Sequence, residues 1–296
     1  MEHSITDWVS AASGDRITFR QAVHTVLYGI STSEFLQPKM IMKGGMLLGI
    51  RYQSSRFTED IDFSTSLKLS DFEDVDEFKK EFIDELNEAL QVAQAELPYG
   101  VKCKVQSLKV QPRNSQEDSF PSFNLKIGYA PISDDALISR LERGQSPKTI
   151  KIDYSFNEYT HKVEDLAVES EDDPVQAYGF SDLIAEKYRS MIQQIVRNRS
   201  RRQDVYDLNY LLNNVDEVSS AEKMNILVSL ISKSDGRLDS KELYREALDN
   251  EEIKARSQAN YHTLHEDIEG ELPDFDTSYE FVNSFFKSLP WEHLSR

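Results

Sequence analysis

The chain has 296 residues, of which 52 are Asp or Glu and 34 are Lys or Arg, so its formal net charge is −18 at pH 7. This excess of acid disfavours a broad, non-specific nucleic-acid-binding surface, because such a surface would repel phosphates at long range. Local basic sites stay compatible with it. The length is sufficient for two modest domains, each with its own core.

The sequence favours a protein of the reducing cytosol. Its single cysteine, Cys103, cannot form an internal disulfide. No run of residues approaches the roughly 20 apolar positions that a membrane span needs, and the first residues lack a signal-peptide pattern. We therefore expect a cytoplasmic protein with no membrane partner.

The first part of the chain predicts helices followed by strands. Apolar residues recur at helical spacing up to about residue 37, and Pro38 ends that region. We then expect strand 39–43, helix 46–52, a strand around residues 60–62, helix 71–96 with Ser70 as its N-cap, and strands 101–110, 123–130 and 149–156. This order predicts an α+β domain in which helices flank a mixed sheet.

The remainder of the chain predicts helices alone. An acidic run at residues 169–174 reads as a linker, which divides the chain into a first domain, 1–174, and a C-terminal helical domain, 175–296. Turn residues separate the expected helices, which cover residues 181–196, 202–212, 221–232, 240–248 and 277–286.

Two features between residues 40 and 64 indicate phosphate and metal chemistry. Gly44 and Gly45 allow a sharp turn where a helix begins, and the free N–H groups of a helix start can bind phosphate. Asp60 and Asp62 project from one face of a strand, and adjacent carboxylates repel each other unless a cation lies between them. A phosphate-binding turn beside a pair of carboxylates is typical of nucleotidyl transfer.

Further charged residues could complete this site. Lys43, Arg51 and Arg56 flank the glycine turn and the aspartate strand, where they could balance the charge of a triphosphate. For Lys43 and Arg51 the alternative is an ordinary surface charge. Asp153 is the candidate for a third carboxylate, as a metal ligand or as the group that accepts a proton. It shares a strand face with Lys151, so an exposed ion pair with that lysine is the alternative.

Lys187 is expected on a helix, in line with Leu183 and Met191, and a lysine beside an apolar stripe needs a partner. Asp204 shares a face with Leu208 on the next expected helix. In one interpretation Lys187 binds substrate phosphates, and Asp204 positions it or the acceptor. In the other, the two residues form a structural ion pair between helices.

Four arginines gather between these two expected helices: Arg197, Arg199, Arg201 and Arg202. They could contact a nucleic acid or a nucleotide. The alternative is a basic helix terminus that complements the helix dipole.

Taken together, these motifs resemble those of the AbiEii/AbiGii toxin family, a branch of the DNA polymerase β-like nucleotidyltransferases. The resemblance spans roughly residues 35–215. It rests on the Lys43-Gly-Gly turn, on Arg56, on the Thr-Glu-Asp-Ile-Asp strand that ends at Asp62, and on segments 182–187 and 202–208. Gln203 departs from the pattern, since the family usually has a basic residue there. The resemblance implies a polymerase β-like nucleotidyltransferase domain joined to a C-terminal helical domain.

The family's chemistry is the transfer of a nucleoside monophosphate from an NTP, with release of pyrophosphate. The resemblance implies that Asp60, Asp62 and Asp153 hold Mg²⁺ or Mn²⁺, and that Lys187 and Asp204 take part in catalysis. It further implies an RNA acceptor, with the tRNA 3′ end as the leading suggestion. The protein would then be the toxin of a bacterial toxin–antitoxin or phage-defence system, with an antitoxin encoded nearby that need not bind it directly.

Two alternatives stay open at this point. The acceptor could be a protein or a small molecule, which would leave the fold and the metal chemistry unchanged. The chain could also be a non-catalytic nucleotide-binding or interaction module of the same fold.

Overall fold

The computed structural model describes residues 4–112, 120–169 and 173–293. The chain forms two compact units. The first comprises Met1–Gln53, Glu59–Glu158 and Val163–Ala177, and the second comprises Ser54–Thr58, Tyr159–Lys162 and Tyr178–Arg296.

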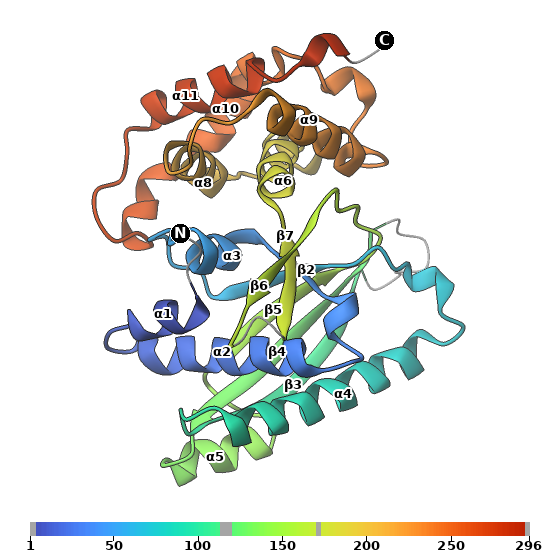
Figure 1. Ribbon diagram of the computed structural model, residues 1–296, viewed down its shortest axis with the longest axis vertical. Coiled ribbons are helices and arrows are strands. Elements are labelled where there is room, and N and C mark those ends of the chain that lie inside the picture. Colours follow the sequence, from blue (N-terminus) through green and yellow to red (C-terminus); the bar gives the residue numbers. More distant parts are fainter. Residues whose placement is uncertain (1–3, 113–119, 170–172, 294–296) are drawn as a thin grey trace. The chain divides into compact units, whose positions relative to one another are not determined.

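A mixed sheet of seven strands forms the centre of the first unit (Figure 1). The strands are β1 (Ile41–Lys43), β2 (Asp60–Ser64), β3 (Val101–Gln111), β4 (Ser122–Pro131), β5 (Thr149–Ser155), β6 (Val163–Ala167) and β7 (Pro174–Tyr178), in the order β3-β4-β5-β2-β1-β7-β6. The β2–β5 and β1–β7 pairs are parallel, whereas β1–β2, β3–β4 and β4–β5 are antiparallel. The predicted α+β class with a mixed sheet is confirmed.

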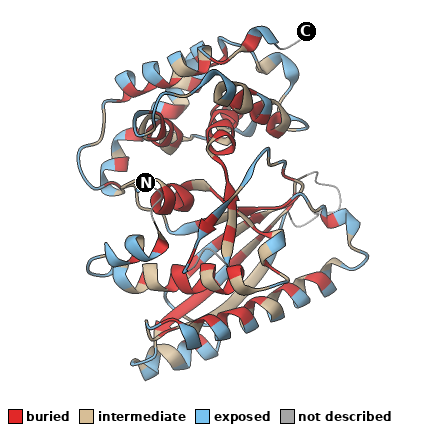
Figure 2. Ribbon diagram, in the orientation of Figure 1, coloured by how far each residue is buried: buried red, intermediate tan, exposed pale blue. Residues whose placement is uncertain are grey.

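The two longest helices of this unit cover the apolar face of the sheet. The unit contains α1 (Ile5–Ser10), α2 (Arg16–Thr32), α3 (Gly44–Arg51), α4 (Val75–Glu96) and α5 (Asp135–Glu142). Phe82 of α4 packs on Phe123 of β4 and Tyr154 of β5, and all three side chains are fully buried. Because side chains alternate across a strand, the residues next to Phe123 and Tyr154 point to the opposite face. Figure 2 shows the buried residues along the sheet and the inner sides of the helices.

The long helix α4 begins later than its sequence suggests. Its N-cap is Asp74, whose carboxylate accepts hydrogen bonds from the backbone N–H groups of Asp76 and Glu77. Ser70 instead lies in a single 3-10 turn, so its prediction as the N-cap is wrong. An aspartate can satisfy two free N–H groups of the first turn and also complements the helix dipole.

The two strands β6 and β7 were not expected. The sequence predicts a linker at residues 169–174, of which residues 170–172 lie outside the described residues. β6 is an edge strand in which only Leu166 is buried, so it lacks the alternation that identifies a strand in sequence. β7 pairs with β1 through Met42 and Ala177, so the sheet continues beyond the expected boundary at residue 174.

The second unit is helical. Its helices are α6 (Phe180–Ile192), α7 (Gln194–Arg197), α8 (Arg202–Asn213), α9 (Ser220–Ser234), α10 (Glu251–Gln258) and α11 (Phe275–Lys287). The helix expected at 240–248 is wrong, since this stretch forms two 3-10 turns, Ser240–Glu242 and Ala247–Asp249. Asp239 and Glu242 cap the first turn reciprocally, which satisfies its backbone within one turn.

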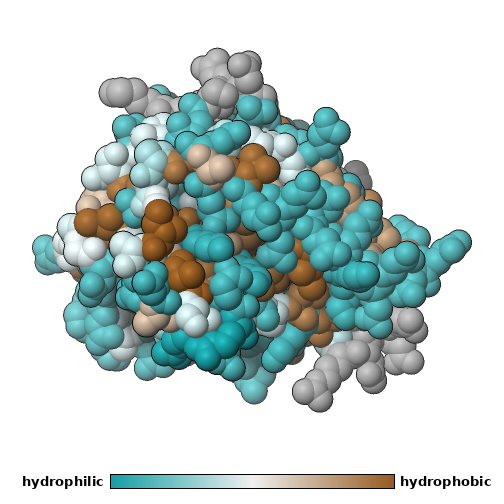
Figure 3. Space-filling view, turned by 90° about the horizontal axis from the view of Figure 1, so that it is seen from below, coloured by the Kyte–Doolittle hydropathy of each residue, from teal (hydrophilic) through white to brown (hydrophobic). Residues whose placement is uncertain are grey.

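The surface of the protein is largely polar where it can be seen. On the face shown in Figure 3, hydrophobic side chains lie in small groups between hydrophilic ones. Among the described helices, none has the length and apolar character that crossing a bilayer requires.

Candidate active site

Two aspartates of β2 lie on the sheet face that α2 and α4 leave uncovered. Asp62 is the register partner of Lys43 in β1 and of Asp153 in β5. Asp60 is the register partner of Lys151, and the Lys151 Nζ lies 3.5 Å from its Oδ1. The Asp60 side chain is 53% exposed. The structure therefore places Asp62 beside Asp153 and Asp60 beside Lys151.

Gly44 forms the close contact between the glycine turn and the aspartate strand. Its φ is +75°, and a Cβ at this position would lie 2.1 Å from Asp62 Oδ2. Glycine is therefore required at position 44 for two reasons: it tolerates the positive φ, and it has no side chain that would clash with Asp62. Gly44 is also the first residue of α3, and the N-cap, Lys43, provides no side-chain cap. The first turn of α3, which includes the buried Gly45, thus begins beside the Asp62 carboxylate.

Gly44→Ala should reduce nucleotidyl transfer by about 100-fold, because the new methyl group must displace the Asp62 carboxylate, and a shift of about 1 Å can cost that much. Gly14→Ala is the matched control. Gly14 also has a positive φ, +56°, but a Cβ there would meet nothing within 4 Å. Both variants should lose about 1–2 kcal/mol of stability, measured by urea unfolding, through backbone strain. Equal transfer rates in the two variants would contradict the proposed contact.

Asp153 has an unsatisfied carboxylate oxygen. Its buried Oδ1 has no hydrogen-bond partner among the described residues, although the polar side chains of Ser122 and Asn124 in β4 lie near enough to favour its charged form. Burial raises the pKa of Asp153, and the nearby Lys43 opposes this shift. Lys151 pairs with Asp60, so the alternative ion pair between Lys151 and Asp153 is not observed. An unsatisfied buried carboxylate oxygen beside Asp62 is suited to a cation.

The donor set suits a hard divalent cation that the substrate helps to bind. Within residues 4–112, 120–169 and 173–293, no group of three or more His, Cys, Asp or Glu side chains forms a ready cage for a metal ion. Mg²⁺ rarely needs such a cage, because it keeps several waters and commonly binds one or two carboxylates together with substrate phosphates. Asp62 and Asp153, adjacent in register, fit this requirement. The predicted metal ligation stays a prediction.

Lys43 and Arg51 are both buried, so the alternative of ordinary surface charges is wrong for both. Lys43 Nζ lies 2.8 Å from Glu158 Oε2, just beyond the end of β5. Arg51 donates to Glu164 Oε2 at 3.1 Å and to the Asp165 carbonyl at 2.7 Å, both in β6. These ion pairs hold α3 and β1 to neighbouring segments of the first unit. Their predicted contact with phosphates stays a prediction.

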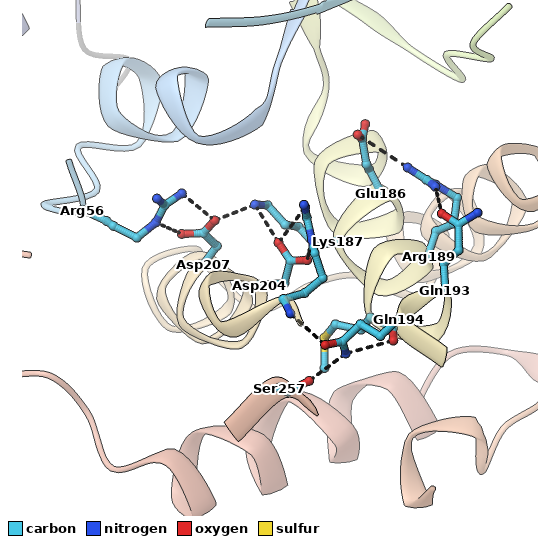
Figure 4. A network of polar contacts seen from close by, with 11 residues as sticks. Arg56, Glu186, Lys187, Arg189, Gln193, Gln194, Asp204, Asp207 and Ser257 are labelled. Carbon is cyan, nitrogen blue, oxygen red and sulfur yellow. Dashed lines mark hydrogen bonds and ion pairs between the residues drawn. The ribbon is translucent and has the colours of Figure 1, made fainter. Parts of the chain in front are cut away.

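The second unit contains a chain of ion pairs built on α6 and α8 (Figure 4). Arg56 donates two hydrogen bonds to Asp207, from Nε to Oδ1 at 2.7 Å and from an Nη to Oδ2 at 2.9 Å. Lys187 Nζ lies 2.5 Å from Asp207 Oδ2 and 3.1 Å from Asp204 Oδ1. Both carboxylates are fully buried. The Lys187–Asp204 pair considered from the sequence is thus present, as part of a larger network.

The charges of this network stabilise one another. Burial raises the pKa of Asp207, but Arg56 and Lys187 outweigh that effect and lower it to about 2. Burial likewise lowers the pKa of Lys187, but Asp207 and Asp204 outweigh it, so that pKa is raised. Asp207 and Lys187 are therefore both charged near neutral pH.

The lowered pKa predicts a stability change in acid. In the unfolded chain Asp207 should titrate near pH 3.9, and in the folded protein near pH 2. Its contribution, on the order of 2–3 kcal/mol, is complete above pH 5 and is lost as the pH falls toward 2. The free energy of unfolding can be measured by urea titration for the protein and for its Asp207→Asn variant. The difference between the two values should therefore become smaller as the pH falls from 5 to 3. A constant difference over this range would contradict the assignment.

The four predicted arginines separate into two pairs. Arg201 Nε donates to Asp204 Oδ2 at 2.7 Å, and an Nη of Arg202 lies 3.4 Å from Asp267 Oδ2. Arg197 and Arg199 are exposed, and their side chains make no ion pair within the part of the chain that the structure describes. Arg197 and Arg199 are therefore the two more exposed members of the group, while Arg201 and Arg202 are half-buried and paired with carboxylates.

The sequence does not predict two of the ion-pair partners: Glu158, and Asp207, which lies in the segment 202–208 that carries the resemblance but is given no role there. Asp207 lies three residues after Asp204 and so shares its helix face, a signal that could have identified it as a second partner of Lys187. Glu158, the partner of Lys43, gave no signal, because the two residues are 115 positions apart.

A mixed sheet with carboxylates beside a glycine turn at a helix start is an arrangement suited to nucleotidyl transfer. The chain matches the family described as nucleotidyl transferase AbiEii toxin, type IV TA system, over residues 25–281, and it belongs to this family. The predicted family and the predicted enzyme class are confirmed. None of the curated proteins matches the chain significantly.

Several solved structures are similar to this chain. A candidate nucleotidyltransferase from H. pylori has a TM-score of 0.50 at 11% identity, and the match covers 96% of this chain and 100% of that one. It supports the same fold. MenT4, a nucleotidyltransferase toxin from Mycobacterium tuberculosis, has a TM-score of 0.47 at 15% identity, covering 96% and 97%. JHP933 from Helicobacter pylori has a TM-score of 0.43 at 14% identity, covering 93% and 99%.

Proposed function

We propose that this nucleotidyltransferase moves a nucleoside monophosphate from an NTP to RNA, with the tRNA 3′ end as the acceptor. It acts as the toxin of a bacterial toxin–antitoxin system that serves in phage defence, and it works in the cytoplasm. The observation that carries the catalytic part is the contact of Gly44 with Asp62, beside the unpartnered Oδ1 of Asp153. Family membership supports the toxin role and implies a cognate antitoxin.

In this proposal Asp60, Asp62 and Asp153 hold Mg²⁺, or Mn²⁺ in its place. The ion, when bound, would neutralise phosphate charge and favour ionisation of the attacking hydroxyl. The N–H groups at Gly44 and Gly45 are offered to the phosphates, because a helix start attracts anions. The unpartnered Oδ1 of Asp153 is the oxygen proposed to face the ion.

Positive charge supports the binding of the triphosphate. Lys187 lies between Asp204 and Asp207 in the network of the second unit, and Arg56 joins this network through Asp207. We propose that Lys187 acts on the substrate phosphates, positioned by Asp204. We propose phosphate binding for Arg56, Lys43 and Arg51 as well.

An RNA acceptor is supported by basic side chains that are available for binding. Arg197 and Arg199 are exposed, and we propose that they contact RNA, together with the half-buried Arg201 and Arg202. Phosphate contacts of this kind supply most of the affinity of non-specific binding to nucleic acids. The net charge of −18 favours the other candidate, a protein or small-molecule acceptor, because it opposes long-range attraction of RNA.

Label transfer distinguishes these acceptors. The protein is incubated with Mg²⁺, each α-labelled NTP in turn, and total cellular RNA, beside an Asp60→Ala/Asp62→Ala variant. We expect label in a tRNA-sized band with the unaltered protein alone. Label on polypeptide would refute the RNA acceptor, and label that persists in the double variant would refute the role of the aspartates.

A further inference from the structure

The sheet of the first unit separates basic from acidic side chains. Strands β3, β4 and β5 contain five lysines and one acidic residue, Asp153, in a chain where acidic residues outnumber basic ones by 52 to 34. Helix α4, which packs on the apolar face, contains seven acidic residues and two lysines. A polyanion that approaches this unit is therefore repelled on the α4 side and attracted to the strands.

The lysines share the sheet face of the candidate catalytic carboxylates. Lys126 of β4 is the register partner of Lys151 of β5, which is the partner of Asp60. Lys109 of β3 is the partner of Asn124, which is the register partner of Asp153. Register partners project to the same side of a sheet, and so do residues two apart on a strand. The positive charges thus form a row that ends at the carboxylates.

Three of the five lysines are available to a ligand. Lys102 and Lys104 both bind Glu142 of α5, and their hydrogen bonds lower the pKa of that glutamate to about 2. Lys109 and Lys126 are exposed and make no ion pair with any described residue. Lys151 is 56% exposed and only 3.5 Å from Asp60.

Helix α5 limits the surface at one end. A Cβ on Gly128, two residues after Lys126 and on the same face, would lie 2.8 Å from Leu141 Cδ1 of α5. The uncovered part of the face therefore runs from Lys109 and Lys126 toward the carboxylates of β2. Across the three strand spacings from β3 to β2 it extends about 14 Å.

We propose that Lys109, Lys126 and Lys151, the sheet lysines, bind the phosphate backbone of a single RNA strand whose reacting end lies at Asp60 and Asp62. This inference rests on the proposed RNA acceptor and adds the surface that holds it. The row leads away from the carboxylates over three strands, so it suits a polymer of phosphates better than the compact triphosphate of an NTP. Lys151, next to Asp60, holds the phosphates nearest to the reacting hydroxyl.

The test compares two variants with equal changes of charge. Lys109→Gln/Lys126→Gln removes two sheet lysines and leaves the partner of Asp60 in place. Lys79→Gln/Lys80→Gln removes the two lysines of α4, on the opposite side of the sheet. Binding of a labelled single-stranded RNA is measured without NTP over a range of salt concentrations, and binding of an NTP is measured separately by calorimetry.

For the sheet variant we expect RNA affinity to fall about 10-fold at low salt, and the slope of log K against log salt to decrease by about 1.4, or 0.7 for each lost phosphate contact. NTP affinity should be unchanged, and the α4 variant should bind RNA like the unaltered protein. RNA binding equal in both variants, or absent from the unaltered protein, would overturn the inference. The inference would also be overturned if the sheet variant lost as much affinity for the NTP as for RNA, because the lysines would then bind the triphosphate.

This experiment also separates the surface from the reaction. If RNA binding depends on the sheet lysines but the label is transferred to another acceptor, the proposed RNA-binding surface stands and the proposed RNA acceptor is refuted. Transfer to RNA with unchanged binding in the sheet variant would refute the surface alone.

Discussion

Asp62→Asn should reduce nucleotidyl transfer by at least about 10³-fold, or roughly 4 kcal/mol of transition-state stabilisation. The amide has the shape of the carboxylate, so it can lie against Gly44 as Asp62 does. It lacks the charge that a divalent cation needs as a ligand. The loss should therefore appear in turnover, measured by release of pyrophosphate, while the thermal unfolding of the protein is unchanged.

Asp84→Asn is the matched control, because this exposed aspartate of α4 undergoes the same chemical change on the other side of the sheet. It should retain full activity. An active Asp62→Asn variant would contradict the assignment of Asp62 as a metal ligand. If the Asp62→Asn variant were inactive and also unfolded, its loss of activity would result from the loss of structure instead.

Asp207→Ala should destabilise the second unit by about 3–5 kcal/mol. The substitution removes the partner that Arg56 and Lys187 share and leaves both cations in a buried site. Lys187 would keep only Asp204, which also binds Arg201. Loss of one member from a buried network costs more than loss of a surface ion pair, for which the typical value is below about 1 kcal/mol.

The unfolding of the second unit can be followed separately. Trp291 is buried there, and in a Trp8→Phe background it is the one remaining tryptophan of the chain, so its fluorescence reports this unit. Asp216→Ala, at an exposed position just beyond α8, should change the urea midpoint little. A similarly small change for Asp207→Ala would show that the network does not stabilise this unit.

Much of the fold could be predicted because patterns among residues close in sequence determine its helices and strands. The alternation of Ile150, Ile152 and Tyr154 with Lys151 and Asp153 identified β5 and placed the carboxylate on the polar face. The strand β6 could not be predicted in this way, because an edge strand with one buried residue shows no alternation. The start of α4 was wrong because Ser70 and Asp74 are both good caps, and sequence alone does not rank them.

The candidate site was predictable where it depends on neighbours in sequence. Gly44 and the pair Asp60 and Asp62 are close along the chain, and their geometry follows from a turn and a strand. The partners of Lys43 and Arg51 were not predictable, since each lies more than 100 residues away. The sequence therefore identified which residues carry charge in the site, but not which of those charges other residues already neutralise.

The most direct test of nucleotidyl transfer at the aspartate strand is a comparison of two labels. The protein is given Mg²⁺, RNA and an NTP labelled at either the α- or the γ-phosphate, beside the Asp60→Ala/Asp62→Ala variant. We expect α-label in the RNA, γ-label in pyrophosphate, and neither product from the variant. Transfer of γ-label to the acceptor, or undiminished transfer by the variant, would contradict the account.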